Sequence, residues 1–410
     1  MRKTLLIATL IFTSGILYSQ TVFNRIIADT SSQFVSSVVA IDTGYVFVSG
    51  LYNELGIRSF ALTYVNGEGN KQWKHIYGSN SMEYWEGFNN SFKQCGNSFC
   101  LAGTITNSDS VGILLSCYDN NFDTNTSYFL SHDTVWKGGF NFIKTPNHYF
   151  ITGQIYNYEL NKYHSLLIKA SINGNQVWAK SYGNVYEYGR QIISTSDNSI
   201  LIGGSTYSFQ ANNSIEKWYL LKTDTAGSVI WEQGFGHNSR LNGSVMGLIE
   251  TTDSCYLACG SYPAAKFGSG SGTILWDGCL RKIDPEGDII WTKNYRTYSK
   301  ITNTQLIRFD NTIYSIINKN GDLYILGGEK SYVGTYRGYL QKISKSGDIC
   351  WKRDYYAIHP GSTSQWLVSF QNTVGDGFIL AGYGNEYGSY GYNPPQQAWL
   401  VKTDSLGLDG

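Results

Sequence analysis

The sequence predicts an all-β protein assembled from repeated units of about 50 residues. Three observations support this: the amino-acid composition, a recurring glycine and a recurring turn. The 410 residues include 45 Gly, 32 Tyr, 19 Phe and 11 Trp but only 3 Met and 6 Pro. Such enrichment in aromatic residues is typical of strands and excludes a coiled coil, a collagen or a disordered chain.

The recurring glycine ends the second β-like run of each unit, directly after a small residue. Successive marks of this kind are 50 to 68 residues apart. They are Gly50, Gly103, Gly153, Gly204, Gly260, Gly328 and Gly382. Seven marks predict seven units, and each unit holds four short strand-like runs.

The recurring turn joins the third and fourth runs in the pattern Lys-x-Asp/Ser-x-x-Gly-x-x-x-Trp. It is complete in four units, which end in Trp178, Trp231, Trp291 and Trp351. An Asp, Asn or Ser side chain can bind the backbone two residues on, and Gly supplies the positive φ that closes a short hairpin. Because one tryptophan position recurs, we expect it to have a structural role. The first unit keeps Asn66, Gly69 and Trp73, whereas the second is degenerate at 119–126.

Seven four-stranded units predict a seven-bladed β-propeller. The seventh unit keeps Lys402, Asp404 and Gly407, but its tryptophan would fall at position 411. The segment TVFNRII, residues 21–27, precedes the first unit as a spare strand, with Phe23 suited to the tryptophan position. We therefore expect this N-terminal strand to complete the last blade, close the ring and hide two sheet edges.

The first residues indicate export. Residues 1–19 place Arg2 and Lys3 before an apolar run that ends in Tyr18 and Ser19, which is typical of a cleavable signal peptide. Residues 20–410 then form a single propeller domain, secreted or held at the cell envelope. No later stretch approaches the roughly 20 apolar residues of a membrane helix. The 31 basic and 31 acidic residues balance, so we expect neither nucleic-acid binding nor membrane insertion.

The seven cysteines do not predict a disulfide framework in a chain of this length. Cys95 and Cys100 flank an expected turn and could meet across a hairpin. Cys255 and Cys259 lie about 13 Å apart along one strand and cannot bond to each other. The six-residue stretch CGNSFC is a poor zinc motif, so we expect buried or hairpin cysteines and no metal.

At these repeats the sequence resembles secreted seven-bladed propeller proteins of Bacteroidetes-type bacteria. It resembles, more distantly, PQQ-type propellers with a tryptophan-docking turn. The resemblance covers nearly all of the chain after residue 19 and implies the fold without specifying a function. PQQ-type enzymes carry a pair of neighbouring cysteines, which this sequence lacks. We therefore expect no quinone and no other cofactor.

Two groups of residues are candidates for a binding site. The face with the second-to-third and fourth-to-first strand connections receives the long loops 156–164, 207–218, 262–276 and 383–399, so it is the expected binding face. Near the axis and on the last of these loops, the candidates are Trp85, Trp136, Lys137, Tyr188, Arg190, Trp366, Tyr387, Tyr390 and Tyr392. Packing between blades is the alternative explanation for all of these aromatic residues.

Motifs for catalysis are scarce. The six histidines form no His-Glu-x-x-His pattern, and no Gly-x-Ser-x-Gly elbow occurs. The leading hypothesis is a monomeric, non-enzymatic propeller that binds a glycan or a protein at the cell surface. The alternatives are a carbohydrate-active enzyme, a glycoside hydrolase or lyase, with its site at the central channel, and a structural subunit of a surface assembly.

Overall fold

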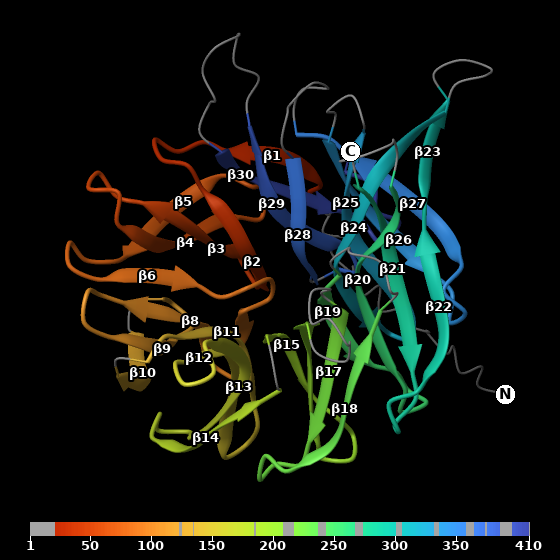
Figure 1. Cartoon of the computed structure of the whole chain (residues 1–410). Coiled ribbons are helices and arrows are strands. Elements are labelled where there is room, and N and C mark those ends of the chain that lie inside the picture. Colours follow the sequence, from red (N-terminus) through yellow and green to blue (C-terminus); the bar gives the residue numbers. More distant parts are fainter. Residues whose placement is uncertain are drawn as a thin grey trace, which may run out of the picture.

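Seven antiparallel sheets are arranged around a common axis in the computed structural model (Figure 1). The structure describes residues 21–122, 125–133, 135–183, 186–207, 217–236, 243–266, 274–300, 306–331, 336–357, 365–373, 375–385 and 396–409. The expected signal peptide lies outside these residues. Each sheet contacts the next around the ring, and β2 of the first sheet contacts β28 of the last, which closes the circle. The predicted seven-bladed all-β propeller is therefore confirmed.

The strands follow one another outward from the axis within each blade. Blade 1 contains β2 (Phe34–Ile41), β3 (Gly44–Tyr52), β4 (Arg58–Asn66) and β5 (Lys71–Tyr77). Blade 2 contains β6 (Glu83–Glu86), β7 (Phe92–Gln94), β8 (Phe99–Thr106), β9 (Val111–Tyr118) and β10 (Asn125–Asp133). Blade 3 contains β11 (Lys137–Lys144), β12 (His148–Asn157), β13 (Lys162–Ser171) and β14 (Gln176–Tyr182). Blade 4 contains β15 (Glu187–Ser194), β16 (Ile200–Thr206), β17 (Lys217–Thr223) and β18 (Val229–Phe235).

The remaining three blades follow the same plan, except that β23 of blade 6 is an additional strand that pairs only with the first residues of β24, 306–309. Blade 5 contains β19 (Val245–Glu250), β20 (Tyr256–Lys266), β21 (Ile274–Ile283) and β22 (Ile289–Tyr295). Blade 6 contains β23 (Thr297–Lys300), β24 (Leu306–Lys319), β25 (Asp322–Ser331), β26 (Tyr336–Ile343) and β27 (Ile349–Tyr355). Blade 7 contains β28 (Gln365–Asn372), β29 (Phe378–Asn385), β30 (Gln396–Thr403) and, from the other end of the chain, β1 (Phe23–Ile27). No helix among the described residues is long and apolar enough to cross a membrane.

The N-terminal strand closes the ring as the sequence predicts. Strand β1 pairs antiparallel with β30, with Arg25 opposite Leu400 (Figure 1). Phe23 and Ile27 are buried against the first and last blades. The indole nitrogen Nε1 of the buried Trp399 donates a 2.7 Å hydrogen bond to Asn24 Oδ1. The first strand therefore covers an edge that blade 7 would otherwise expose.

An aromatic ring on the outermost strand of each blade packs on the turn of the next blade. The turn is rigid because, for example, Asp224 Oδ1 accepts hydrogen bonds from the backbone N–H groups of Ala226 and Ser228, and Gly227 has φ 78°. The ring and turn residues in contact are Phe23 with Gly69, Trp73 with Phe122, Tyr128 with Gly174, Trp178 with Gly227, Trp231 with Gly287, Trp291 with Gly347, and Trp351 with Gly407. The recurring tryptophan therefore joins blades, and Phe23 takes its place at the point of closure.

The recurring glycines lie where the inner strand of a blade bulges. In blade 4 the pairing shifts by one residue after Gly189, and a Cβ on Gly204 would lie 1.6 Å from the carbonyl oxygen of Tyr188. In blade 4 only glycine tolerates this approach. In blades 1 and 6 the residues at this position are Ser49 and Gly327, one residue before the glycines marked in the sequence.

The expected meeting of Cys95 and Cys100 is wrong. The register of the β7–β8 hairpin places Lys93 opposite Cys100, whereas on the other side of β8 the direct partner is Cys117. Cys100 and Cys117 form the disulfide, and Cys95 is a buried free thiol. Cys255 and Cys259 are not bonded to each other, as predicted.

Candidate functional site

The segment 87–91 of blade 2 lies on the propeller axis. It interrupts the inner strand between β6 and β7, and its hydrogen bonds reach the inner strands of five other blades. Asn90 Nδ2 donates to Ser315 Oγ of blade 6, and Asn90 Oδ1 accepts from Ser369 Oγ of blade 7. Further bonds run from the backbone N–H of Asn90 to the Ser36 carbonyl, from the backbone N–H of Phe88 to the Phe140 carbonyl, and from the side chains of Asn141 and Gln191 to the Asn89 carbonyl. We name residues 87–91 the axial segment.

A cavity of about 740 Å³ lies above the axial segment. Most of its lining residues lie near the beginning of the first or third strand of a blade, or near the end of the second strand. These positions place the cavity at the face that receives the loops predicted to bind. Its wall is formed by Phe34, Val35, Ser36, Arg58, Glu83, Trp85, Glu86, Gly87, Phe88, Asn89, Thr104, Thr106, Trp136, Phe140, Gln154, Met246, Tyr314, Val368 and Tyr383. Because Gly87, Phe88 and Asn89 belong to the axial segment, that segment forms the floor of the cavity.

A buried ion pair is part of the cavity wall. Arg58 Nη2 of blade 1 lies 2.6 Å from Glu86 Oε1 of blade 2, and their side chains are only 10% and 7% exposed. Within the described part of the chain, Arg58 Nε and Glu86 Oε2 have no hydrogen-bond partner. Such buried atoms are costly to leave unpaired, and both are shielded from solvent.

Aromatic rings surround the guanidinium group of this pair. Its carbon lies 4.8 Å from the ring centre of Trp85, 5.1 Å from that of Tyr52 and 5.7 Å from that of Phe34. The pair also requires glycine at position 50, because a Cβ there would lie 2.1 Å from Glu86 Oε1. The cation is therefore fixed in place by packing as well as by charge.

Titration of Glu86 should make the free energy of unfolding fall as the pH rises from about 5 to 7. Burial raises the pKa of Glu86 to about 7, although Arg58 acts in the opposite direction. An unfolded Glu has a pKa of about 4.3, so the folded state binds more protons in this window. The free energy of unfolding should therefore decrease by up to about 1.4 kcal/mol per pH unit. Urea denaturation of wild type and Glu86→Gln across this range measures the effect; identical slopes would contradict it.

Two of the predicted site residues line the cavity. Trp85 is 39% exposed, and its Nε1 donates a 3.0 Å hydrogen bond to Glu83 Oε2. Trp136 is half-buried and packs edge-on against Tyr163, with ring centres 5.3 Å apart. The Arg58 guanidinium lies over the Trp85 ring, and both tryptophans keep part of their surface on the cavity wall.

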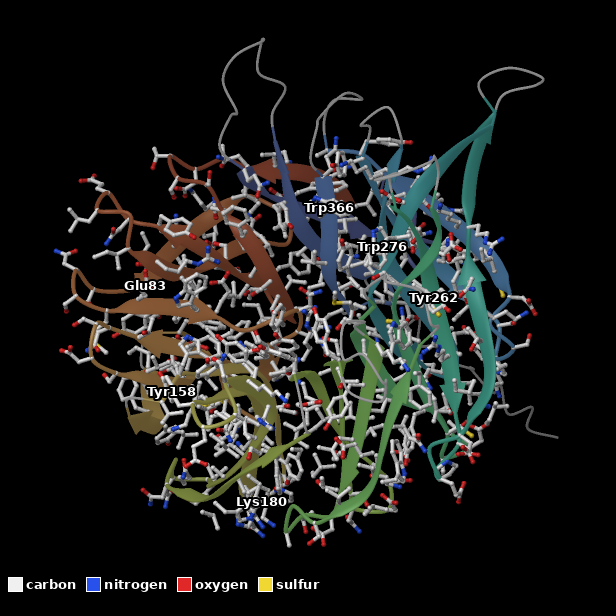
Figure 2. The ribbon with its side chains drawn as sticks, viewed as in Figure 1. Glu83, Tyr158, Lys180, Tyr262, Trp276 and Trp366 are labelled. Carbon is white, nitrogen blue, oxygen red and sulfur yellow. A yellow bond between two sulfur atoms is a disulfide. The ribbon has the colours of Figure 1, made fainter. Side chains whose placement is uncertain are left out.

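The other predicted residues lie behind or beside the wall. Lys137 is buried, and Tyr188 is half-buried beside Tyr163. Arg190 lies behind the wall, with its guanidinium group 5.0 Å from the ring centre of Phe88 and its Nη1 3.7 Å from Met246 Sδ. Trp366, on β28, packs against Tyr314 and Tyr336 (Figure 2). Tyr387, Tyr390 and Tyr392 lie outside the described residues.

Sequence reasoning missed Arg58 and the axial segment. Arg58 begins a third strand, charged residues also begin the third strands of blades 3 and 4, as Lys162 and Lys217, and Arg337 is the second residue of the third strand of blade 6. This recurrence was a signal for charges at one level of the ring, but it does not reveal which charge lines a cavity. Within the described ranges, no group of three or more His, Cys, Asp or Glu side chains could hold a metal ion.

The fold and the cavity define a β-propeller with an axial pocket, and comparisons with known proteins agree on the fold. No protein-family model and no curated protein sequence matches the chain. A puromycin-hydrolyzing peptidase of Mycobacterium tuberculosis is similar in structure, with a TM-score of 0.52 and 8% identity over 90% of this chain and 52% of that chain. At such an identity the likeness shows the fold and not the reaction.

Two further structures are more weakly similar. The GH93 alpha-L-arabinofuranosidase of Fusarium graminearum, solved with arabinobiose, has a TM-score of 0.49 and 11% identity, over 95% of this chain and 99% of that chain. A protein of unknown function from Bacteroides caccae has a TM-score of 0.39 and 12% identity, over 75% of this chain and 91% of that chain. The distant neighbours thus include both enzymes and proteins of unknown function.

Proposed function

We propose that this chain is a secreted, non-enzymatic binding propeller of the cell envelope and that its axial cavity holds a glycan. The observation that carries the proposal is the cavity itself. Its volume of about 740 Å³ falls within the range typical of small-molecule sites, about 300 to 1,000 Å³. Aromatic rings line it together with a few polar side chains, and sugars offer C–H faces to the former and hydroxyl groups to the latter.

The polar groups of the wall suit a neutral, hydroxyl-rich ligand. Arg58 is paired with Glu86, and Glu83 adds one further carboxylate, so the wall carries no large excess of either charge. Gln154, Thr104 and Thr106 add amide and hydroxyl groups to the same wall. These features favour a carbohydrate over an anion or a cation.

Export is part of the proposal. It rests on the arrangement of residues 1–19 and on the Cys100–Cys117 disulfide, since disulfides persist mainly in oxidising compartments. A glycan or a protein at the cell surface is the partner class that such a location offers.

A carbohydrate-active enzyme is the second candidate, because Glu83 and Glu86 both line the cavity and Glu86 has its pKa raised to about 7. A general acid requires such a pKa. The two carboxylates, however, are three residues apart on one strand and bind different neighbours, the Trp85 indole and the Arg58 guanidinium. A hydrolase needs both carboxylates on the scissile bond, so binding without cleavage fits this arrangement better.

A glycan array probed with residues 20–410 tests the proposal. We expect the wild-type protein to bind at least one glycan class and Trp85→Ala to lose about tenfold or more in affinity. Phe129→Ala is the matched control, because Phe129 is 52% exposed on the outermost strand of blade 2, far from the axis. Absence of binding to any glycan, or equal binding by both variants, would contradict the proposal. Release of shorter sugars from the bound glycan would favour the enzyme.

A further inference from the structure

A row of aromatic side chains leads from the cavity to the surface of blade 3. Trp136 lines the cavity and contacts Tyr163 of β13, with ring centres 5.3 Å apart. Tyr163 contacts Tyr156 of β12 at 4.9 Å, and Tyr156 contacts Tyr158 at 4.8 Å. We name these four residues the aromatic track. It is continuous from the cavity mouth to the tip of the β12–β13 hairpin, where Figure 2 labels Tyr158.

The hairpin that bears the track is built from two long strands. Strands β12 and β13 each have 10 residues, whereas β16 and β17 of blade 4 each have 7. Tyr156 and Tyr163 are directly opposed in the hairpin register. The turn is fixed by Asn157 Oδ1, which accepts a 3.0 Å bond from the Leu160 N–H, and by a bond from the Tyr156 hydroxyl to Asn161 Oδ1. The track is therefore held rigid before any ligand arrives.

Packing between blades does not explain the outer end of the track. Tyr158 is 63% exposed, and the adjacent Leu160 is 52% exposed. The rings meet mainly edge to face, at 82° for Tyr156 with Tyr158 and 86° for Trp136 with Tyr163. This geometry orients Tyr158 without covering it. A large aromatic ring that stays mostly in solvent on a rigid hairpin is typical of a recognition residue.

The chemistry of the track resembles that of the cavity wall. It offers ring faces and phenol hydroxyl groups, and the charges at its tip, Glu159 and Lys162, are of opposite sign. Burial raises the pKa of Tyr163, with its tyrosine neighbours adding to the effect, so its hydroxyl remains a donor at neutral pH. A long neutral chain of sugars therefore suits both surfaces, whereas a strongly charged polymer suits neither.

We propose that the aromatic track extends the glycan site, so that the protein binds an extended oligosaccharide with one end in the axial cavity and the rest along blade 3. This inference rests on the proposed function and adds the length of the ligand to it. Tyr158 contacts sugar residues that a disaccharide in the cavity does not reach. Affinity therefore increases with chain length, and Tyr158 supplies part of that increase.

Calorimetric titration with xylo-, cello-, manno- and chito-oligosaccharides, from disaccharides to hexasaccharides, tests this inference. For at least one series we expect wild-type affinity to rise about tenfold or more with length. Tyr158→Ala should abolish most of that rise while leaving the disaccharide affinity unchanged. Phe129→Ala, an equally exposed aromatic change on the outer strand β10, should behave as wild type in every titration.

The outcomes separate the two proposals. A disaccharide that binds as tightly as the hexasaccharide, or a Tyr158→Ala variant that matches Phe129→Ala, overturns the extended site and leaves the cavity site standing. Loss of binding to a defined protein partner in Tyr158→Ala, with sugar binding unaltered, assigns the track to protein recognition and also overturns the extended site. Wild-type protein that binds no member of any series overturns both proposals.

Discussion

Deletion of residues 21–28 should lower the melting temperature by about 6 °C or make the protein aggregate. The deletion removes β1, which supplies the buried side chains Phe23 and Ile27, and it leaves the Trp399 Nε1 donor without Asn24. Burial of two such side chains and the loss of a buried hydrogen bond together correspond to about 5 kcal/mol of unfolding free energy. The exposed edge of β30 would then be open to pairing with another molecule. Differential scanning calorimetry and light scattering measure both effects.

The same strand provides the control for this experiment. Arg25 is exposed on β1, so Arg25→Ala should change the free energy of unfolding by no more than about 0.5 kcal/mol. A synthetic peptide TVFNRIIA, added in trans, should restore the melting temperature of the truncated protein, because its strand can pair with β30 as β1 does. A truncated protein that stays monomeric and as stable as wild type would show that β1 does not hold the ring closed.

Replacement of Asn90 by alanine should lower the free energy of unfolding by about 3 kcal/mol. Asn90 joins Ser315 of blade 6 to Ser369 of blade 7 across the axis, and two such bonds contribute about 0.5–1.5 kcal/mol each. Its φ of 63° lies in the left-handed region, which costs alanine a further 1–2 kcal/mol or so. Because the axial segment forms the cavity floor, ligand affinity should also fall. Urea denaturation and a glycan titration measure the two effects.

Two variants separate the conformational cost at Asn90 from the loss of its hydrogen bonds. Asn90→Gly keeps the left-handed backbone and loses the bonds, so it should be milder than Asn90→Ala. Asn320 has φ 54° in an exposed turn, and Asn320→Ala should show the backbone cost without any effect on the cavity. If Asn90→Ala is no more harmful than Asn320→Ala, the axial segment does not join the blades.

The architecture was predictable because the same sequence motif recurs in most of the blades. Asp224 and Gly227 form the same turn as their counterparts in the other blades, and Trp231 docks on Gly287 as Trp351 docks on Gly407. An environment that recurs leaves a periodic pattern, and the pattern also located Phe23 at the point of closure. The exact bulge position in blades 1 and 6 was not predictable, since two adjacent small residues fit the pattern there.

The site was less predictable because it depends on contacts between blades. Trp85 and Trp136 were found because inner-strand aromatics near the axis stand out, but Lys137 on the same pattern is buried. The axial segment occurs in one blade, and Asn90 binds residues more than 200 positions away in the sequence. Arg58 belongs to blade 1 and forms its ion pair with Glu86 of blade 2. The repeat pattern does not predict these contacts between blades, because they form only when the ring closes.

A crystal structure of the protein with the longest oligosaccharide that binds it tests the central claim most directly. We expect sugar rings in the axial cavity, with one ring stacked on Trp85 and hydroxyl groups within hydrogen-bond distance of Arg58 and Glu86. Sugar bound only on the opposite face, among the tight turns such as that containing Asp224 and Gly227, would contradict the assignment of the cavity as the binding site.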